Sequence, residues 1–293
     1  MQRYFLLPFF TCLMLSGCNR AINNQVATNF EKGKPLSVLT NKTLKEASGL
    51  ESSIRNPDLL WTHNDSGNEA SIFLIDEDLD IKMTVTLAGI ENRDWEDITV
   101  GPGPDSSQTY VYVGDIGDND AIYPYKYIYR FPEPVFSTTD HVQITEFDTI
   151  IFKLEGAVKD TESLFIDANT RNLYVVSKRE EPVFLYMLKY PQVNGDTLIA
   201  SNVLSLPFKE IVSADMSPDG DILMKNYTTI YYWENKNNED LISLLNRRPG
   251  EIPYEEEPQG EAIAWATRKP GFYTFSEKKK KKPSYLYFYA KKP

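Results

Sequence analysis

Acidic side chains stand at the head of short β-prone runs that are spread along the whole chain. They are Glu46, Glu96, Glu162, Asp215 and Glu261. A second β-prone run follows each acid-headed run and ends in polar residues. Three of these polar residues offer further oxygen atoms: Asn64, Asp115 and Asn119. Carboxylates that meet at one site repel one another, so they must be protonated, paired with cationic side chains or bound to a metal. Carboxylate and amide oxygens are the ligands that calcium prefers. The pattern predicts either calcium held by these eight residues or salt bridges to Lys and Arg, and the sequence leaves both open.

Cationic and imidazole side chains follow the same runs and supply the candidate catalytic groups. They are His63, Lys178, Arg179 and Lys225. We expect the Lys and Arg side chains to stabilise negative charge that develops on a phosphoryl or lactone oxygen. His63 is a candidate for contacting the substrate or for metal-assisted general-base chemistry. The chain has no G-x-S-x-G elbow and only two histidines, which argues against a serine hydrolase and against a zinc site.

The elements that must position these residues repeat along the chain. Each acid-headed run is followed by a turn, a second β-rich run and a third. The second runs cover 59–62, 110–113, 173–176, 222–224 and 272–275, and the third runs cover 72–75, 127–129, 184–186, 230–233 and 285–289. Candidate fourth strands lie at 81–87, 142–153, 198–206 and 240–245. Four antiparallel strands that recur roughly every 50 residues are typical of propeller blades.

We therefore predict an all-β chain that forms a five-bladed β-propeller in a single domain over residues 36–293. The last segment has only three strands, and residues 36–40 are expected to supply its fourth, which closes the ring and covers an exposed edge. A six-bladed ring is the alternative, because the 66 residues between Glu96 and Glu162 leave room for another blade. In either ring the first strand of each blade lines the central channel, so the acidic residues are predicted to share one mouth of it.

Composition fits a globular protein and limits its partners. Hydrophobic residues make up 41% of the 293 residues and charged residues 25%, which is enough apolar material for a core. The net charge of −11 repels a phosphate backbone, so we expect no nucleic-acid partner. A small molecule, a glycan or a cation is the expected ligand.

The N-terminal residues carry targeting information. Residues 1–17 have Arg3 before an apolar run too short to cross a membrane, which predicts a signal peptide. The sequence Leu15-Ser16-Gly17-Cys18 is similar to a bacterial lipobox, so we predict that Cys18 is lipidated and becomes the mature N-terminus. Residues 18–35 would then form a lipidated, flexible tether. These features predict an extracytoplasmic protein that is anchored by lipid to the cell envelope, at the outer membrane.

Four motifs carry a resemblance to known proteins. They are THNDSG at 62–67, RDWEDI at 93–98, VGDIGDN at 113–119 and QGEAIA at 259–264. Over roughly residues 44–290 the chain resembles a group of uncharacterised secreted bacterial β-propellers. More distantly, its layout is similar to that of propeller phytases and of gluconolactonase-type, calcium-dependent lactonases. The resemblance implies a propeller with a metal-assisted hydrolytic site at one mouth.

Two functions fit these observations. One is an envelope-anchored, calcium-dependent hydrolase of phosphoesters or lactones. The other is a noncatalytic lipoprotein that recognises a glycan, a peptide or a partner protein at the same mouth. A propeller fold alone does not decide between them.

Overall fold

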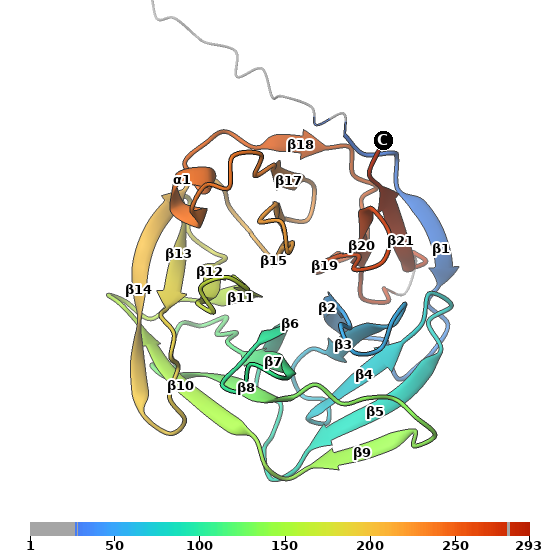
Figure 1. Ribbon diagram of the computed structural model, residues 1–293, viewed down its shortest axis with the longest axis horizontal. Helices are drawn as coiled ribbons and strands as arrows, with labels where there is room; N and C mark the ends of the chain where they lie inside the picture. The colour runs from blue at the N-terminus through green and yellow to red at the C-terminus, as the bar shows by residue number, and fades with distance from the viewer. Residues whose placement is uncertain (1–26, 28, 280–281) are drawn as a thin grey trace, which may run out of the picture.

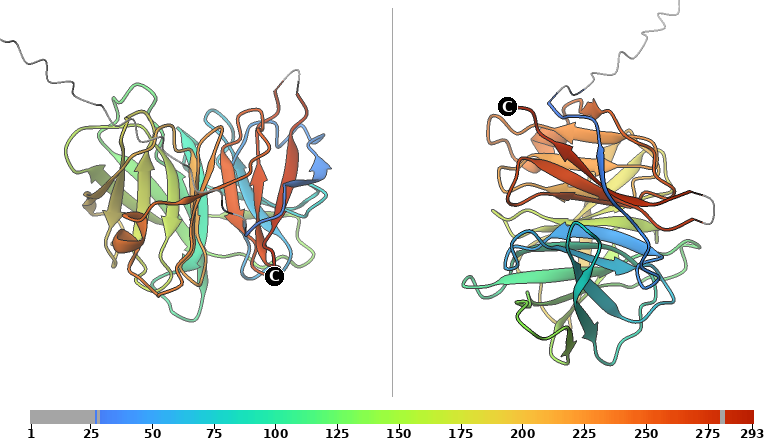
Figure 2. Two further views of the ribbon diagram at one scale, coloured as in Figure 1. Left: turned by 90° about the horizontal axis from the view of Figure 1, so that it is seen from above. Right: turned by 90° about the vertical axis from the view of Figure 1, so that its right-hand side faces the viewer.

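The computed structural model describes residues 27, 29–279 and 282–293. These residues form 21 strands and one short helix, so the chain is nearly all-β, as predicted. The sheets are arranged radially around a central axis in a propeller-like ring (Figure 1). Figure 2 shows the ring from the side, with strands running between its two faces. The predicted signal peptide and the lipidation site Cys18 lie outside the described residues.

The innermost strands surround the axis. They are β2 (Ala47–Ser52), β6 (Trp95–Pro102), β11 (Thr161–Ile166), β15 (Ser213–Met216) and β19 (Ala262–Trp265). Each contacts the next in this order, and β19 contacts β2. All of them run in the same direction: the Ser48 hydroxyl near the start of β2 donates to the Glu96 carbonyl, and the Ser52 hydroxyl at its end donates to the Trp265 carbonyl. The starts of these strands therefore meet at one mouth of the axis and their ends at the other.

From each inner strand the chain passes outward through antiparallel neighbours. The next strands are β3 (Leu60–Asn64), β4 (Ser71–Ile75), β5 (Ile81–Leu87), β7 (Thr109–Asp115), β8 (Lys126–Pro132), β12 (Leu173–Ser177), β13 (Val183–Leu188), β14 (Thr197–Leu206), β16 (Ile222–Lys225), β17 (Ile230–Trp233), β20 (Gly271–Phe275) and β21 (Tyr285–Ala290). The alternation of apolar residues in these runs places their side chains in clusters between neighbouring sheets. The core is therefore divided among the contacts between sheets.

Two outer strands connect neighbouring sheets. The predicted strand 142–153 is in fact β9 (His141–Ile144) and β10 (Asp148–Leu154). Strand β9 pairs in parallel with β5 of the preceding sheet, whereas β10 pairs with both β8 and β14. The second pairing joins two groups of four strands into one eight-stranded sheet.

The predicted strand at 240–245 is wrong. Residues Leu241–Leu245 form the helix α1, and the Asp240 carboxylate caps it by accepting from Ser243 N at 3.0 Å. The apolar residues Leu241, Leu244 and Leu245 are buried, at a spacing that suits a helix. The outermost strand of this sheet is β18 (Gly250–Ile252), which pairs with β17.

An N-terminal strand completes the last sheet. Strand β1 (Lys34–Val38) pairs antiparallel with β21, close to the predicted position. The packed chain begins earlier than the predicted boundary at residue 36: Phe30 is 2% exposed and lies between Tyr232 and Phe272, and Ala27 N donates to Glu251 O. Part of the predicted tether is thus packed against the ring. Among the described residues, no helix has the length and apolarity needed to cross a membrane.

Candidate functional site

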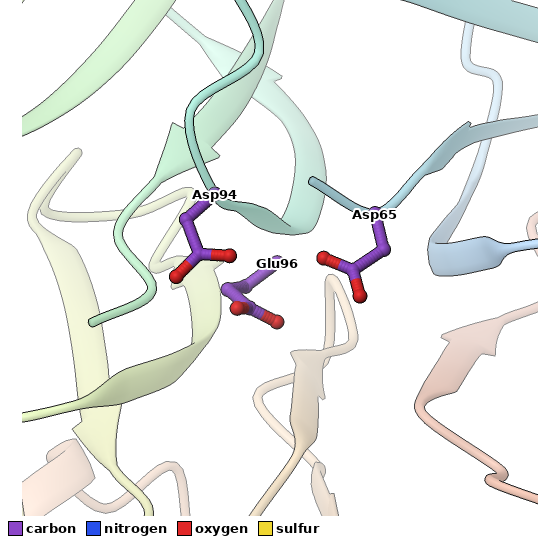
Figure 3. Close-up of side chains that lie close together, drawn as sticks. All are labelled: Asp65, Asp94 and Glu96. Atoms are coloured by element: carbon purple, nitrogen blue, oxygen red, sulfur yellow. The ribbon is translucent and has the colours of Figure 1, made fainter. Parts of the chain in front are cut away.

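Three carboxylates converge at the mouth where the inner strands begin. Asp65, Asp94 and Glu96 have carboxylate oxygens that all lie within 4.8 Å of one another. Figure 3 shows the three groups turned toward a common space. Glu96 is buried, and the two aspartates are partly exposed. We call these residues the acidic trio.

Local irregularities in the strands place the trio. Strand β6 pairs with β7 through Trp95–Asp115 and Asp97–Gly114, so Glu96 is the extra residue at a register shift. Such a shift re-aims the side chain that it contains. Asn92 links the segment that holds Asp65 to the segment that holds Asp94 and Glu96. Its side chain donates to the Asp65 carbonyl at 2.9 Å and accepts from Trp95 N at 3.0 Å.

Gly117 leaves the space that the trio needs. The backbone N–H of Gly117 donates to the Asp94 carbonyl at 3.1 Å, which holds this loop against the site. A Cβ at this position would overlap the carboxylates of both Glu96 and Asp94. Only glycine lets the backbone approach the two acids this closely.

Within the trio, Glu96 is electrostatically unsatisfied, whereas Asp65 accepts from Ser66 N. Glu96 is 6% exposed, and its carboxylate accepts no hydrogen bond from the described residues. Burial, followed by the charges of Glu162 and Asp65, raises the pKa of Glu96 well above its usual value. Burial and the neighbouring Asp65 also raise the pKa of Asp94 to about 6. A buried carboxylate that lacks a hydrogen-bond donor is costly to ionise, so this site favours a proton or a metal ion.

A cationic side chain stands beside the trio. Lys178 Nζ lies 2.7 Å from Glu162 Oε1, and its charge is close enough to act on Glu96. Burial opposes the charged form of Lys178, but the Glu162 carboxylate outweighs it and raises the Lys178 pKa. Lys178 also lies over the ring of Tyr227, whose hydroxyl donates to Glu261 Oε1 at 2.7 Å. Glu162, Lys178, Tyr227 and Glu261 thus form a connected group along one side of the mouth.

Other predicted ligands at this mouth are engaged elsewhere. Asp115 pairs with Arg93 at 3.2 Å, and the exposed Asn119 accepts from Arg179. Arg179 also donates to Asp160 at 2.8 Å. Glu46 accepts from Asn68 at 2.8 Å and pairs with Lys45.

Asn64 is placed differently from these residues. It lies at the end of β3, directly before Asp65, and donates through Nδ2 to the Thr43 carbonyl at 2.7 Å. Its Oδ1 is buried and has no partner among the described residues.

Asp215 does not lie at the predicted mouth. Ser213, not Asp215, begins β15 and pairs with Lys225, so Asp215 is two residues further toward the strand end. Its carboxylate accepts from Trp265 N, at the end of β19, with a distance of 2.7 Å. Asp215 therefore belongs to the opposite end of the axis, because the run Asp215-Met216-Ser217 follows the start of its strand instead of heading it.

Two of the candidate catalytic residues are enclosed. His63 is fully buried, its ring meets Trp95 edge-on and its Nδ1 lies 3.1 Å from the Asn64 carbonyl. Lys225 is also fully buried and donates to the Gly260 carbonyl at 2.6 Å and to the Tyr254 hydroxyl at 3.0 Å. Of the four candidates, Lys178 is the one that the structure brings beside the trio.

Sequence reasoning did not select Asp65 and Asp94 as ligands. Asp65 is the fourth residue of the THNDSG motif, directly after β3, and Asp94 precedes Glu96 by two residues within RDWEDI. The nearness of Asp94 to Glu96, and of Asp65 to Asn64, was the signal in the sequence that could have identified them.

Comparison with known proteins places the fold. No protein-family model matches the chain, and no curated protein sequence matches it. A gluconolactonase from Xanthomonas campestris has a similar structure, with a TM-score of 0.51 and 11% sequence identity over 92% of this chain and 97% of that one. A luciferin-regenerating enzyme has a TM-score of 0.46 and 10% identity over 92% of each chain. At 11% identity the likeness to the gluconolactonase is one of fold, so the chain has a propeller-like architecture that is shared with a lactone-hydrolysing enzyme.

Proposed function

We propose that the acidic trio binds calcium and that the mouth around it hydrolyses lactones. The observation that carries this proposal is the convergence of three carboxylates, of which Glu96 is buried without a hydrogen-bond donor among the described residues. Carboxylate oxygens are hard ligands that suit calcium. Asn64 Oδ1, buried without a partner on the neighbouring strand end, is a further oxygen at this side of the mouth.

The chain's own residues suit ester hydrolysis at this site. A calcium ion held by the trio would polarise a carbonyl oxygen as a Lewis acid. Lys178 carries a positive charge beside the trio and can stabilise the negative charge that develops when water adds to the carbonyl. Glu162 fixes the Lys178 ammonium at 2.7 Å, and the Tyr227 ring packs against it.

The fold supports the same reading. We propose a five-bladed ring, and the closed order of contacts β2, β6, β11, β15, β19 and back to β2 supports it. The architecture shared with a gluconolactonase makes lactones the first substrates to test. Phosphoesters, which the sequence also suggested, belong in the same panel.

The first prediction tests the trio directly. Purified protein is incubated with lactone and phosphoester panels in calcium and in EDTA, and its thermal unfolding is followed in both. We expect calcium-dependent lactone hydrolysis and a higher melting temperature with calcium, because a ligand that binds only the folded state stabilises it. In Glu96→Gln, the activity and the calcium affinity should each fall at least about tenfold, which corresponds to about 1.4 kcal/mol. The rise in melting temperature with calcium should shrink accordingly.

Asp80→Asn is the matched control, because it removes an exposed carboxylate that, within the part of the chain that the structure describes, pairs only with Lys82, at 3.8 Å. It should retain the calcium response and the activity. Calcium-dependent stabilisation without turnover of any ester would reject the hydrolase and favour the binding function. No response to calcium would reject the metal site itself.

We also propose that Cys18 is lipidated and anchors the protein to the outer membrane of the cell envelope. The Leu15-Ser16-Gly17-Cys18 sequence supports this. The second prediction is that the full chain, expressed in a bacterium, fractionates with membranes and incorporates labelled palmitate, whereas Cys18→Ser incorporates none. Cys12→Ser is the matched control and should behave like the unchanged chain, so label that persists in Cys18→Ser would disprove lipidation at Cys18.

A further inference from the structure

A cavity of about 340 Å³ opens at the other end of the central axis, where the inner strands end. Its lining combines the carboxyl groups of Glu51 and Asp215 with the apolar side chains of Ile166, Met216 and Trp265. The acidic trio does not line it. A cavity of this size accommodates a small organic molecule, and few polar groups within an apolar wall are typical of such sites.

The two carboxyl groups are fixed in place without a cationic partner. Glu51 is 7% exposed and accepts from Ser52 N at 2.7 Å and from the Thr99 hydroxyl at 3.2 Å. Asp215 is 5% exposed and accepts from the backbone N–H groups of Trp265 and Met216, both at 2.7 Å. Among the described residues, no Lys or Arg forms an ion pair with either group or lines the cavity. Two buried acids therefore lie next to each other with only neutral donors, and the negative charge of a third buried acid, Asp97, adds to theirs.

The walls provide an apolar surface. Trp265, which lines the cavity, is 8% exposed. Ile54, at the rim, is 47% exposed, and it lines the same cavity. A water molecule or ion alone would leave this apolar area uncovered.

We propose that this cavity binds a small organic cation in which a primary ammonium group is attached to an apolar or aromatic body. The ammonium group would pair with Glu51 and Asp215, and the body would pack against Ile166, Met216 and Trp265. An anionic ligand would face two acids, and a wholly apolar one would leave them buried without a cation.

Binding of a cation in this cavity should displace protons from the two acids. Burial raises the pKa of Asp215 to about 6, and burial followed by the charge of Asp215 raises that of Glu51 well above its usual value. Below those pKa values the pair holds protons, which a cation must displace. Affinity for the cation should therefore rise as pH increases from 5.5 to 7.5.

The probe is phenethylammonium, measured by isothermal titration calorimetry on the purified folded chain in EDTA and again in calcium. 2-Phenylethanol serves as the neutral control, because it has the same ring and chain length. We expect phenethylammonium to bind at least tenfold more tightly than the alcohol, and its affinity to rise at least threefold between pH 5.5 and 7.5.

Variants separate this site from the calcium site. Glu51→Gln and Asp215→Asn should each weaken phenethylammonium binding at least tenfold, and Glu96→Gln should leave it unchanged. If circular dichroism shows that Glu51→Gln or Asp215→Asn does not fold, the unchanged chain decides the question. Its pH dependence and the ratio of its affinities for phenethylammonium and 2-phenylethanol are then the measurements. Equal binding of the two probes, no binding of either, or loss of binding in Glu96→Gln would overturn the proposal. Each of these results is independent of whether the trio binds calcium.

Discussion

His63 shows how one residue can be conspicuous in the sequence and yet lie outside the open site. The side chain has no exposed surface, and its Nε2 atom has no partner among the described residues. Gly49, with φ at +65°, places its backbone directly against this ring, so a Cβ there would collide with Nε2. The imidazole thus fills a gap between β2 and β6, and its burial favours the neutral form.

The third prediction concerns the acid sensitivity that His63 confers. Burial lowers the pKa of His63 to about 4, from an ordinary value of 6.5. The folded state therefore binds fewer protons than the unfolded state between these values, and His63 costs up to about 3 kcal/mol of folding free energy as pH falls from 6.5 to 4. In His141→Gln, which leaves one imidazole, the NMR titration of His63 should have its midpoint well below 6.5. A midpoint near 6.5 would show that the ring is hydrated.

The two alternatives that the sequence left open apply to different residues. Glu162 pairs with Lys178, and Asp115 pairs with Arg93, so salt bridging accounts for these acids. Glu96 has no such partner and lies with Asp65 and Asp94. Of the three converging acids the sequence selected only Glu96, and it could not tell which acids meet a cation, because this depends on side-chain directions that are set by register shifts such as the one at Glu96.

At the scale of elements, the repeated β-rich runs predicted strands correctly and short mixed segments did not. The runs that became β3, β7, β12 and β20 were located from their aromatic and β-branched residues and from their recurrence along the chain. Residues 240–245 were taken for a strand although Asp240 is a helix cap and three leucines follow at helical spacing. Strand β9 was missed as a separate element because its partner β5 belongs to the preceding sheet, and no local pattern reports such a pairing.

The fourth prediction tests how much the segment before β1 contributes to closure. Phe30 packs against Tyr232, Trp265 and Phe272, which belong to two neighbouring sheets. Phe30→Ala removes these contacts and should lower the free energy of unfolding by about 3 kcal/mol, as measured by urea denaturation. Val38→Ala on β1 is the control, since Val38 is 43% exposed, and it should cost about 0.5 kcal/mol or less. Equal effects of the two changes would mean that Phe30 does not hold the sheets together.

The whole molecule carries an excess of buried acid, which links its stability to pH and to calcium. Burial raises the pKa of Asp94 to about 6 and that of Glu96 well above its usual value. The folded state therefore holds more protons than the unfolded state above the ordinary carboxyl pKa. The stability that these protons confer is lost as pH rises through about 6 and beyond.

The fifth prediction follows from this linkage. In EDTA, the melting temperature should fall between pH 6.5 and 8.5, a range in which His63 stays neutral. Calcium should reduce this fall, and its stabilising effect should be larger at pH 8.5 than at pH 6.5, because protons compete with the metal for the trio. Differential scanning calorimetry of the unchanged chain and of Glu96→Gln at both pH values checks this. A calcium effect that is the same at both pH values would contradict it.

The packing of Ala27 against β18 also shortens the reach of the proposed anchor. If Cys18 carries lipid, only about nine residues separate the acyl chains from the ring, and a fully extended tether of that length spans about 30 Å. Ala27 and Phe30, among the first described residues, contact the ring at its outer rim, beside β18 and the end of β21, and not at either mouth (Figure 1). The ring would then stay within about 30 Å of the bilayer surface, so any ligand would have to reach it there.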